Sequence, residues 1–119
     1  MPETTVVLYA EDDGSAPLLT WLDRQPSKVQ DKCLVKIERL AELGHELRRP
    51  DAAFLRDGIH ELRVRHGRVH YRMLYFFHGR TAAVVSHGIA KEKKVPAKEI
   101  ELAVKRRRLF EADPKAHSE

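Results

Sequence analysis

The sequence has 119 residues, of which 42% are apolar, and this length fits one domain with one modest core. Lys and Arg number 22 against 18 Asp and Glu, so the formal charge of +4 favours polyanionic partners over acidic ones. A single cysteine, Cys33, excludes an internal disulfide framework, and the lack of a signal-like or membrane-spanning apolar run at the N-terminus leads us to expect a cytoplasmic protein.

The first half of the sequence predicts one strand and two helices. Residues 4–10 are β-branched and aromatic, which is typical of a strand. A short helix follows and ends before Pro26, because proline disfavours helical geometry in the residue before it. A longer helix covers residues 27–43, and Cys33 lies on its apolar stripe, so we expect a buried and unreactive thiol. The polar, proline-bearing segment 44–57 is predicted to be a connection that passes over the sheet edge.

The second half of the sequence predicts an antiparallel meander of three strands. Apolar and charged side chains alternate over residues 59–66, which places them on opposite faces of a strand. The next run, residues 69–77, is apolar or aromatic on both faces, as in a central strand, and Arg72 alone breaks this pattern. Residues 81–89 are predicted to form the third strand.

A final helix completes the predicted domain. Pro96 opens it, acidic residues occupy its first turns and basic residues its last turn, which matches both ends of the helix macrodipole. An N-terminal strand and two helices, followed by the three-stranded meander and a C-terminal helix, make an α+β fold. We expect residues 1–111 to form one domain and residues 112–119 to be a flexible tail.

The distribution of carboxylates and histidines disfavours a metal site. Glu92 is the only acidic residue between Glu61 and Glu99, which leaves too few ligands for a carboxylate two-metal site. Five histidines lie in the meander, namely His60, His66, His70, His78 and His87. They lack the compact pair-and-pair spacing of zinc ligands, so we expect scattered surface or structural histidines and neither a metal nor another cofactor.

Cations at the same end of several strands suit an RNA phosphate instead. RNA is cleaved without a metal when its 2′-hydroxyl attacks the neighbouring phosphate, provided that the protein positions the strand, assists proton transfer and neutralises charge on phosphorus. Arginine suits the last task because its planar fork forms two parallel hydrogen bonds to phosphate oxygens. Arg63 and Arg72 are the candidates, although Arg63 could instead pair with Glu61 on a solvated face. Arg72 must keep its charge paired or hydrated.

A proton-transfer group is harder to assign. His87 shares a predicted strand face with Ala83 and Val85 and lies near the cationic segment, where close cations would lower its pKa and favour a neutral base. The alternative is a structural histidine at the end of a strand. Glu61 is a second candidate base, and its alternative is an ion pair.

Residues 55–108 contain an ordered series of short motifs. These are G-I-H-E-L-R, Y-R-M-L-Y, a lysine-rich segment, Pro96 and a helix with A-V-K-R. The series resembles the HigB branch of the RelE/ParE toxin superfamily, whose phage-derived members share a pattern close to it. The resemblance implies a RelE-like fold and the toxin of a type II toxin–antitoxin system, a bacterial protein that inhibits translation by cleaving messenger RNA in the ribosomal A site. It also implies a cognate antitoxin, often with a helix-turn-helix domain, as a partner beside the ribosome and the messenger.

The resemblance further implies roles for individual residues. Arg63 and Arg72 match basic positions that RelE-like toxins place on the concave face of the sheet. Lys91 or Lys93 falls where the family has a basic residue after the last strand, and with His87 these residues form the predicted catalytic set. Five further cations are predicted to bind RNA of the messenger or the ribosome, namely Arg65, Lys94, Arg48, Arg49 and Arg107.

Two other functions remain open at this point. A ParE-like inhibitor of DNA gyrase would keep the fold and act by protein contact, but it has no need of paired arginines around a phosphate. A non-catalytic, phage-derived binding module would cause no growth arrest. For the nuclease, the sequence alone predicts that Arg72→Ala abolishes toxicity while the protein stays folded.

Overall fold

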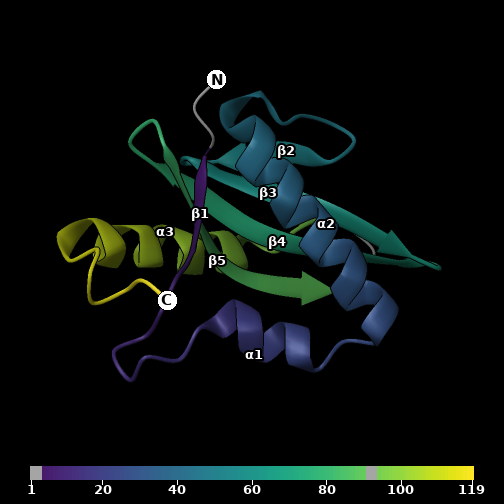
Figure 1. Ribbon diagram of the computed structural model, residues 1–119, viewed down its shortest axis with the longest axis horizontal. Helices are drawn as coiled ribbons and strands as arrows, with labels where there is room; N and C mark the ends of the chain where they lie inside the picture. Colours follow the sequence, from purple (N-terminus) through teal and green to yellow (C-terminus); the bar gives the residue numbers. More distant parts are fainter. Residues whose placement is uncertain (1–3, 91–93) are drawn as a thin grey trace.

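The computed structural model describes residues 4–90 and 94–119 and contains a five-stranded sheet with helices on both faces (Figure 1). Its elements are β1 (Thr5–Leu8), α1 (Pro17–Asp23), α2 (Ser27–Leu43), the 3-10 turn η1 (Gly44–Glu46), β2 (Ala52–Arg56), β3 (Ile59–His66), β4 (Val69–His78), β5 (Ala82–Ala90) and α3 (Ala97–Ala112). The strands lie in the order β1-β5-β4-β3-β2. The fold is therefore α+β, as the sequence predicts.

The strand count and order differ from the prediction. Segment 44–57 is not a plain connection, because its residues 52–56 form β2, an edge strand antiparallel to β3. This strand is only five residues long and comes directly after a polar, proline-bearing stretch, so the sequence does not separate it from the connection. At the opposite edge, β1 pairs in parallel with β5, so the N-terminal strand joins the meander in one sheet.

Helices α1 and α2 cover one face of the sheet. Their buried side chains pack on those of the strands, and this core comprises Leu18, Leu22, Val29, Cys33, Leu40, Leu47, Ala52, Leu62, Val64, Met73, Tyr75, Ala83 and Val85. Cys33 is fully buried, as predicted, and burial raises the pKa of its thiol to about 11, so the thiolate is scarce at neutral pH. Trp21 of α1 lies over Gly88, where an added Cβ would come within 2.3 Å of the indole ring. Glycine therefore permits the close approach of α1 to β5.

Helix α3 covers the other face. Its buried residues Ile100, Ala103 and Phe110 pack in a second core with strand residues that include Leu74 and Phe76. Within the segment 112–119, which the sequence predicts to be a flexible tail, Ala112 still belongs to α3 and the last three residues contact residues 8–10. The backbone of Ser118 bridges to Tyr9, and the Glu119 N–H donates to the Leu8 carbonyl at 3.0 Å.

The helices differ in length, and each contains both apolar and charged residues. Helices α2 and α3 have 17 and 16 residues and carry charged side chains along their length. No helix in the described part of the chain is long and apolar enough to cross a membrane.

Candidate functional site

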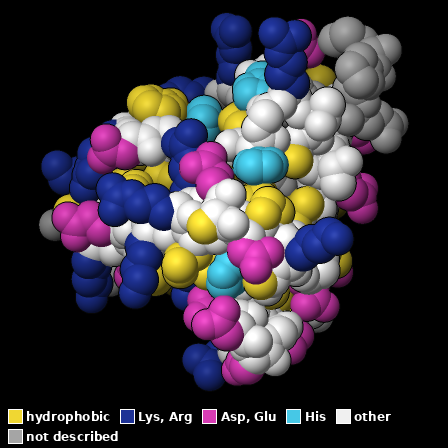
Figure 2. Space-filling model, turned by 90° about the vertical axis from the view of Figure 1, so that its left-hand side faces the viewer, with side chains coloured by type: hydrophobic (Ala, Val, Ile, Leu, Met, Phe, Trp, Pro, Cys, Tyr) yellow, Lys and Arg dark blue, Asp and Glu magenta, His cyan; other side chains and the backbone are white. Residues whose placement is uncertain are grey.

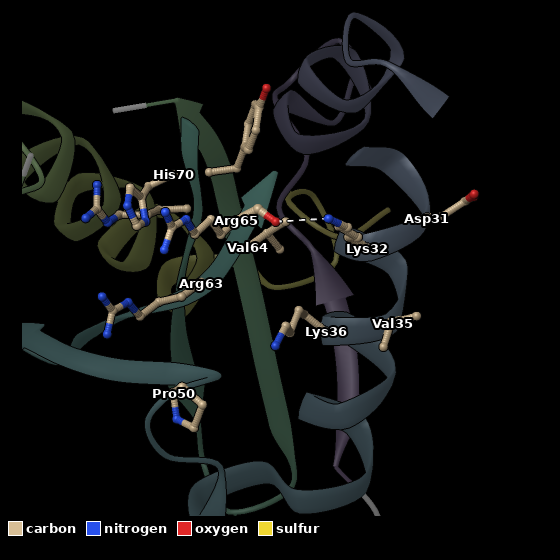
Figure 3. Close-up of a pocket in the computed structure, with 11 residues that line it drawn as sticks. Asp31, Lys32, Val35, Lys36, Pro50, Arg63, Val64, Arg65 and His70 are labelled. Atoms are coloured by element: carbon tan, nitrogen blue, oxygen red, sulfur yellow. Dashed lines mark hydrogen bonds between the residues drawn. The ribbon is translucent and has the colours of Figure 1, made fainter. Parts of the chain in front are cut away.

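Four polar side chains form a compact group where β3 ends and β4 begins. Arg63 lies directly opposite Arg72, and Arg65 lies directly opposite His70, in the antiparallel register of the two strands. Side chains that face each other across such strands share one face of the sheet, with Cβ atoms roughly 4.5–5.5 Å apart. Figure 3 shows Arg63 and His70 pointing away from α2. We call Arg63, Arg65, His70 and Arg72 the strand-end quartet.

A cavity of about 610 Å³ opens beside the quartet, between the edge of β3 and α2 (Figure 3). It forms because the β2–β3 pairing runs only as far as Leu62, after which the Arg63 N–H donates to the Asp51 carbonyl at 2.8 Å. Its walls comprise the quartet together with Asp31, Lys32, Val35, Lys36, Pro50, Val64 and Tyr71. Since the cavity lies at a strand edge, residues that point to either face contribute to its wall.

Arg72 forms a buried ion pair with Glu61. Its Nε lies 2.7 Å from Glu61 Oε1, and each side chain is only 9% exposed. The sequence suggested Arg63 as the partner of Glu61, but Arg72 takes that place. Because a buried charge is costly without its partner, the pair fixes Arg72 firmly within the site.

Arg63 and Arg65 are the more accessible guanidinium groups of the quartet. Arg63 is partly exposed and forms no ion pair with any residue in the described ranges. Arg65 is exposed, and its Nε donates to the Gly67 carbonyl at 3.2 Å. Lys32 of α2 donates to the Arg65 carbonyl at 3.1 Å, which ties the helix to the strand end across the cavity. These two guanidinium groups are thus open to an anion at the strand end, beside the cavity and on the face of the sheet that points away from α2.

His87 lies on the opposite face from the one predicted. Leu74 pairs with His87, whereas the next residue, Tyr75, pairs with Val85, so Ser86 is an extra residue in β5. Such a bulge reverses the alternation of faces beyond it. Val85 therefore packs beneath α1 and α2, while His87 faces α3.

The contacts of His87 are those of a structural histidine. Its Nδ1 lies 2.7 Å from Ser86 Oγ, and its Nε2 lies 3.1 Å from Glu99 Oε1 of α3. The side chain is buried and is not part of the cavity wall. His70 is the histidine that lines the cavity. The sequence predicts His70 to be a surface or structural histidine rather than a metal ligand, and only the cross-strand pairing in the structure places it opposite Arg65.

The environment of His87 predicts an acid-sensitive fold. Burial lowers the pKa of His87, and the Arg106 charge lowers it further, although Glu99 opposes both. The unfolded chain then binds more protons, so this stabilisation is complete above the ordinary pKa of 6.5 and is lost as the pH falls below that value. We expect the free energy of unfolding from urea titrations to fall between about pH 7.5 and about pH 5.5, and to fall less in His87→Gln. Equal pH dependence in the two proteins would contradict this assignment.

The other histidines of the meander make separate contacts. His60 stacks on Tyr75, His66 Nδ1 lies 3.1 Å from Lys32 Nζ, and His78 meets the edge of Phe110. In the ranges 4–90 and 94–119, no three His, Cys, Asp or Glu side chains gather as a metal-binding group.

The remaining predicted cations lie apart from the quartet or outside the described residues. Lys91 and Lys93 fall outside the described residues, and Lys94 is exposed just after them. Arg48 and Arg49 line a second hollow, beside β2. Another cation, Arg107, sits on α3 and donates to the Asp57 carbonyl at 3.4 Å. The structure therefore brings together Arg63, Arg65 and Arg72 of the predicted set.

Positive charge extends beyond the quartet. Figure 2 shows the left-hand side of Figure 1, away from the ends of β3 and β5, and Lys and Arg side chains gather there as well, toward the left and the top of the view. Acidic side chains lie between and below them. The quartet is thus distinguished by its cross-strand pairing and its cavity rather than by charge alone.

Comparison with known proteins identifies the family. A search of curated proteins found no match. Residues 20–108 match the model of a family described as phage derived protein Gp49-like (DUF891), and the match includes α2, strands β2 to β5 and most of α3. This family is toxin-like and of the RelE/HigB type, which confirms the resemblance at that level. Since the match covers most of the 119 residues, the chain belongs to the phage-derived Gp49-like family.

Proposed function

We propose that this protein is the toxin of a type II toxin–antitoxin system and that it cleaves messenger RNA on the ribosome without a metal ion. The observation that carries the proposal is the strand-end quartet, with Arg63 and Arg65 accessible beside the buried Arg72–Glu61 pair. The adjoining cavity of about 610 Å³ has the size of a small-molecule site, for which about 300–1,000 Å³ is usual. A nucleotide of a single strand fits that range.

The chemistry follows from the side chains of the quartet. Arg63 and Arg65 would hold the scissile phosphate through charge-assisted hydrogen bonds and stabilise the charge that develops on its oxygens. The 2′-oxygen forms a new bond to phosphorus while the bond to the 5′-oxygen breaks. The 2′-hydroxyl proton leaves to a base, and a proton reaches the departing 5′-oxygen. His70 is the quartet member whose side chain type commonly performs such transfers.

The proposed partners follow from this function. The messenger would occupy the cavity, and the ribosome would present it in the cytoplasm. Surface cations away from the quartet, such as Arg107, would contact ribosomal RNA without sequence preference. A cognate antitoxin, which we expect to carry a helix-turn-helix domain, would hold the protein inactive.

Induction of the protein in bacterial cells tests this function. We expect translation to stop, new messenger ends to appear and DNA-damage markers to stay at their basal level. The matched control is Arg80→Ala, which removes an exposed arginine in the β4–β5 turn and should remain toxic. A DNA-damage response with intact messenger would assign the protein to gyrase inhibition instead, and absence of growth arrest would indicate a binding module.

A further inference from the structure

A second hollow of about 440 Å³ lies beside β2, outside the proposed catalytic site. It is lined by His45, Leu47, Arg48, Arg49, Ala52, Ala53, Phe54 and His60. These residues come from η1, the turn after it, β2 and the start of β3. Seven of these eight residues therefore come from the segment 44–57 that the sequence predicts to be a connection, and His60 of β3 is the eighth.

Aromatic rings form its wall. His45 stacks on Phe77 with ring centroids 3.7 Å apart, and His60 stacks on Tyr75 with centroids 5.1 Å apart. Phe54 meets His60 edge-on, with centroids 5.1 Å apart at an interplanar angle of 71°. Although phenylalanine is normally buried, Phe54 is 60% exposed. The Phe54 side chain is thus largely open to solvent at the hollow.

The charges of the lining suit an anion. Arg48 and Arg49 are exposed at the hollow, and no carboxylate is among the residues that line it. Burial lowers the pKa of His60, and the charges of His45 and Arg107 lower it further, so its ring is neutral at neutral pH. A flat apolar surface beside two arginines complements a planar, negatively charged ligand.

The two hollows adjoin one turn of the chain. Arg49 lines the second hollow, and the next residue, Pro50, lines the cavity beside the quartet. A single strand that crosses this turn would place one base on Phe54 and carry its phosphates past Arg48 and Arg49 toward Arg63. Aromatic platforms next to cations are the usual means of binding single-stranded nucleic acid.

We infer that the hollow at Phe54 binds one unstacked base of a single-stranded RNA and thereby anchors the strand whose phosphate lies at the quartet. The identity of the ligand as RNA rests on the proposed function. The geometry itself indicates that the ligand of the hollow is a planar base flanked by phosphates. Phe54 supplies the stacking face, and Arg48 and Arg49 supply the phosphate contacts.

Fluorescence anisotropy with a labelled, short single-stranded oligoribonucleotide tests this inference. Phe54→Leu keeps an apolar side chain but loses the ring, and we expect about tenfold weaker binding. Phe54→Trp should bind as well as the original protein, because indole also stacks. Leu109→Ala, which trims another exposed apolar residue, on α3, should leave binding unchanged. A double-stranded RNA of the same sequence should show no dependence on residue 54.

The outcomes separate this inference from the proposed function. Equal affinities of Phe54→Leu and the original protein for the single-stranded oligoribonucleotide would overturn the inference. It would also be overturned if Phe54→Leu weakened the binding of a protein partner but not of the oligoribonucleotide. Displacement of the oligonucleotide by an equal concentration of adenosine 5′-monophosphate would assign the hollow to a free nucleotide and overturn it as well. RNA binding that depends on Phe54 in a protein without nuclease activity would sustain the inference and remove the proposed function.

Discussion

Replacement of Arg63 by alanine is expected to slow messenger cleavage by about 100-fold, the usual loss when one preorganised donor to a developing oxyanion is removed. The side chain is partly exposed and has no ion-pair partner in the described ranges, so the free energy of unfolding should change by less than about 1 kcal/mol. Cleavage on programmed ribosomes and urea titration of the same preparation measure the two effects.

Two matched variants make the Arg63 result specific. Arg63→Lys keeps the charge but loses the planar fork, and we expect it to retain activity between those of the original protein and Arg63→Ala. Arg80→Ala removes an exposed arginine away from the quartet and should cleave at the original rate. Full activity in Arg63→Ala would exclude this residue from the site.

Arg72→Ala is expected to lower the free energy of unfolding by about 3–5 kcal/mol, because it leaves Glu61 charged and buried without its partner. The 2.7 Å contact and the 9% exposure of both side chains place the pair among the buried ones. Thermal and urea unfolding measure the loss. Toxicity should fall in this variant through unfolding as well as through any loss of phosphate binding.

A paired replacement distinguishes the buried charge from simple loss of packing. Arg72→Met combined with Glu61→Leu removes both charges and keeps apolar volume, and such exchanges are often neutral or stabilising. We expect the double variant to recover most of the stability lost in Arg72→Ala and to remain inactive. Stability equal to the original protein in Arg72→Ala alone would show that the ion pair is unimportant.

The ion pair changes the experiment that the sequence suggests. From the sequence alone, Arg72→Ala is predicted to abolish toxicity in a folded protein. The structure shows that this substitution also removes the counterion of Glu61, so inactivity would not separate catalysis from stability. Arg63 forms no ion pair with any of the described residues, so its replacement gives the clearer test.

Much of the sheet is predictable because strand periodicity is a local property. The alternation over residues 59–66 gives the bounds of β3, and the apolar run after Gly67 gives the start of β4. A single arginine in an otherwise buried strand also indicates that Arg72 requires a charged or solvated partner. That expectation is met by Glu61.

The structural features that could not be predicted from the sequence depend on packing and on strand register. Strand β2 is short and weakly patterned, so only its pairing with β3 identifies it. The bulge at Ser86 decides which face His87 occupies, and no turn residue marks it in the sequence. Likewise, the contribution of Lys32 and Lys36 to the cavity arises from how α2 crosses the sheet. His70 becomes a candidate only when register places it opposite Arg65.

The central claim is that arginines at a strand edge hold one RNA phosphate while its own 2′-hydroxyl attacks it. The most direct measurement is the chemical nature of the ends of a messenger cut on the ribosome. We predict 5′-hydroxyl ends opposite 2′,3′-cyclic phosphate ends, and no cleavage when the nucleotide before the scissile bond carries a 2′-deoxyribose. Ends with a 5′-phosphate, or undiminished cleavage of the deoxy-substituted messenger, would contradict it.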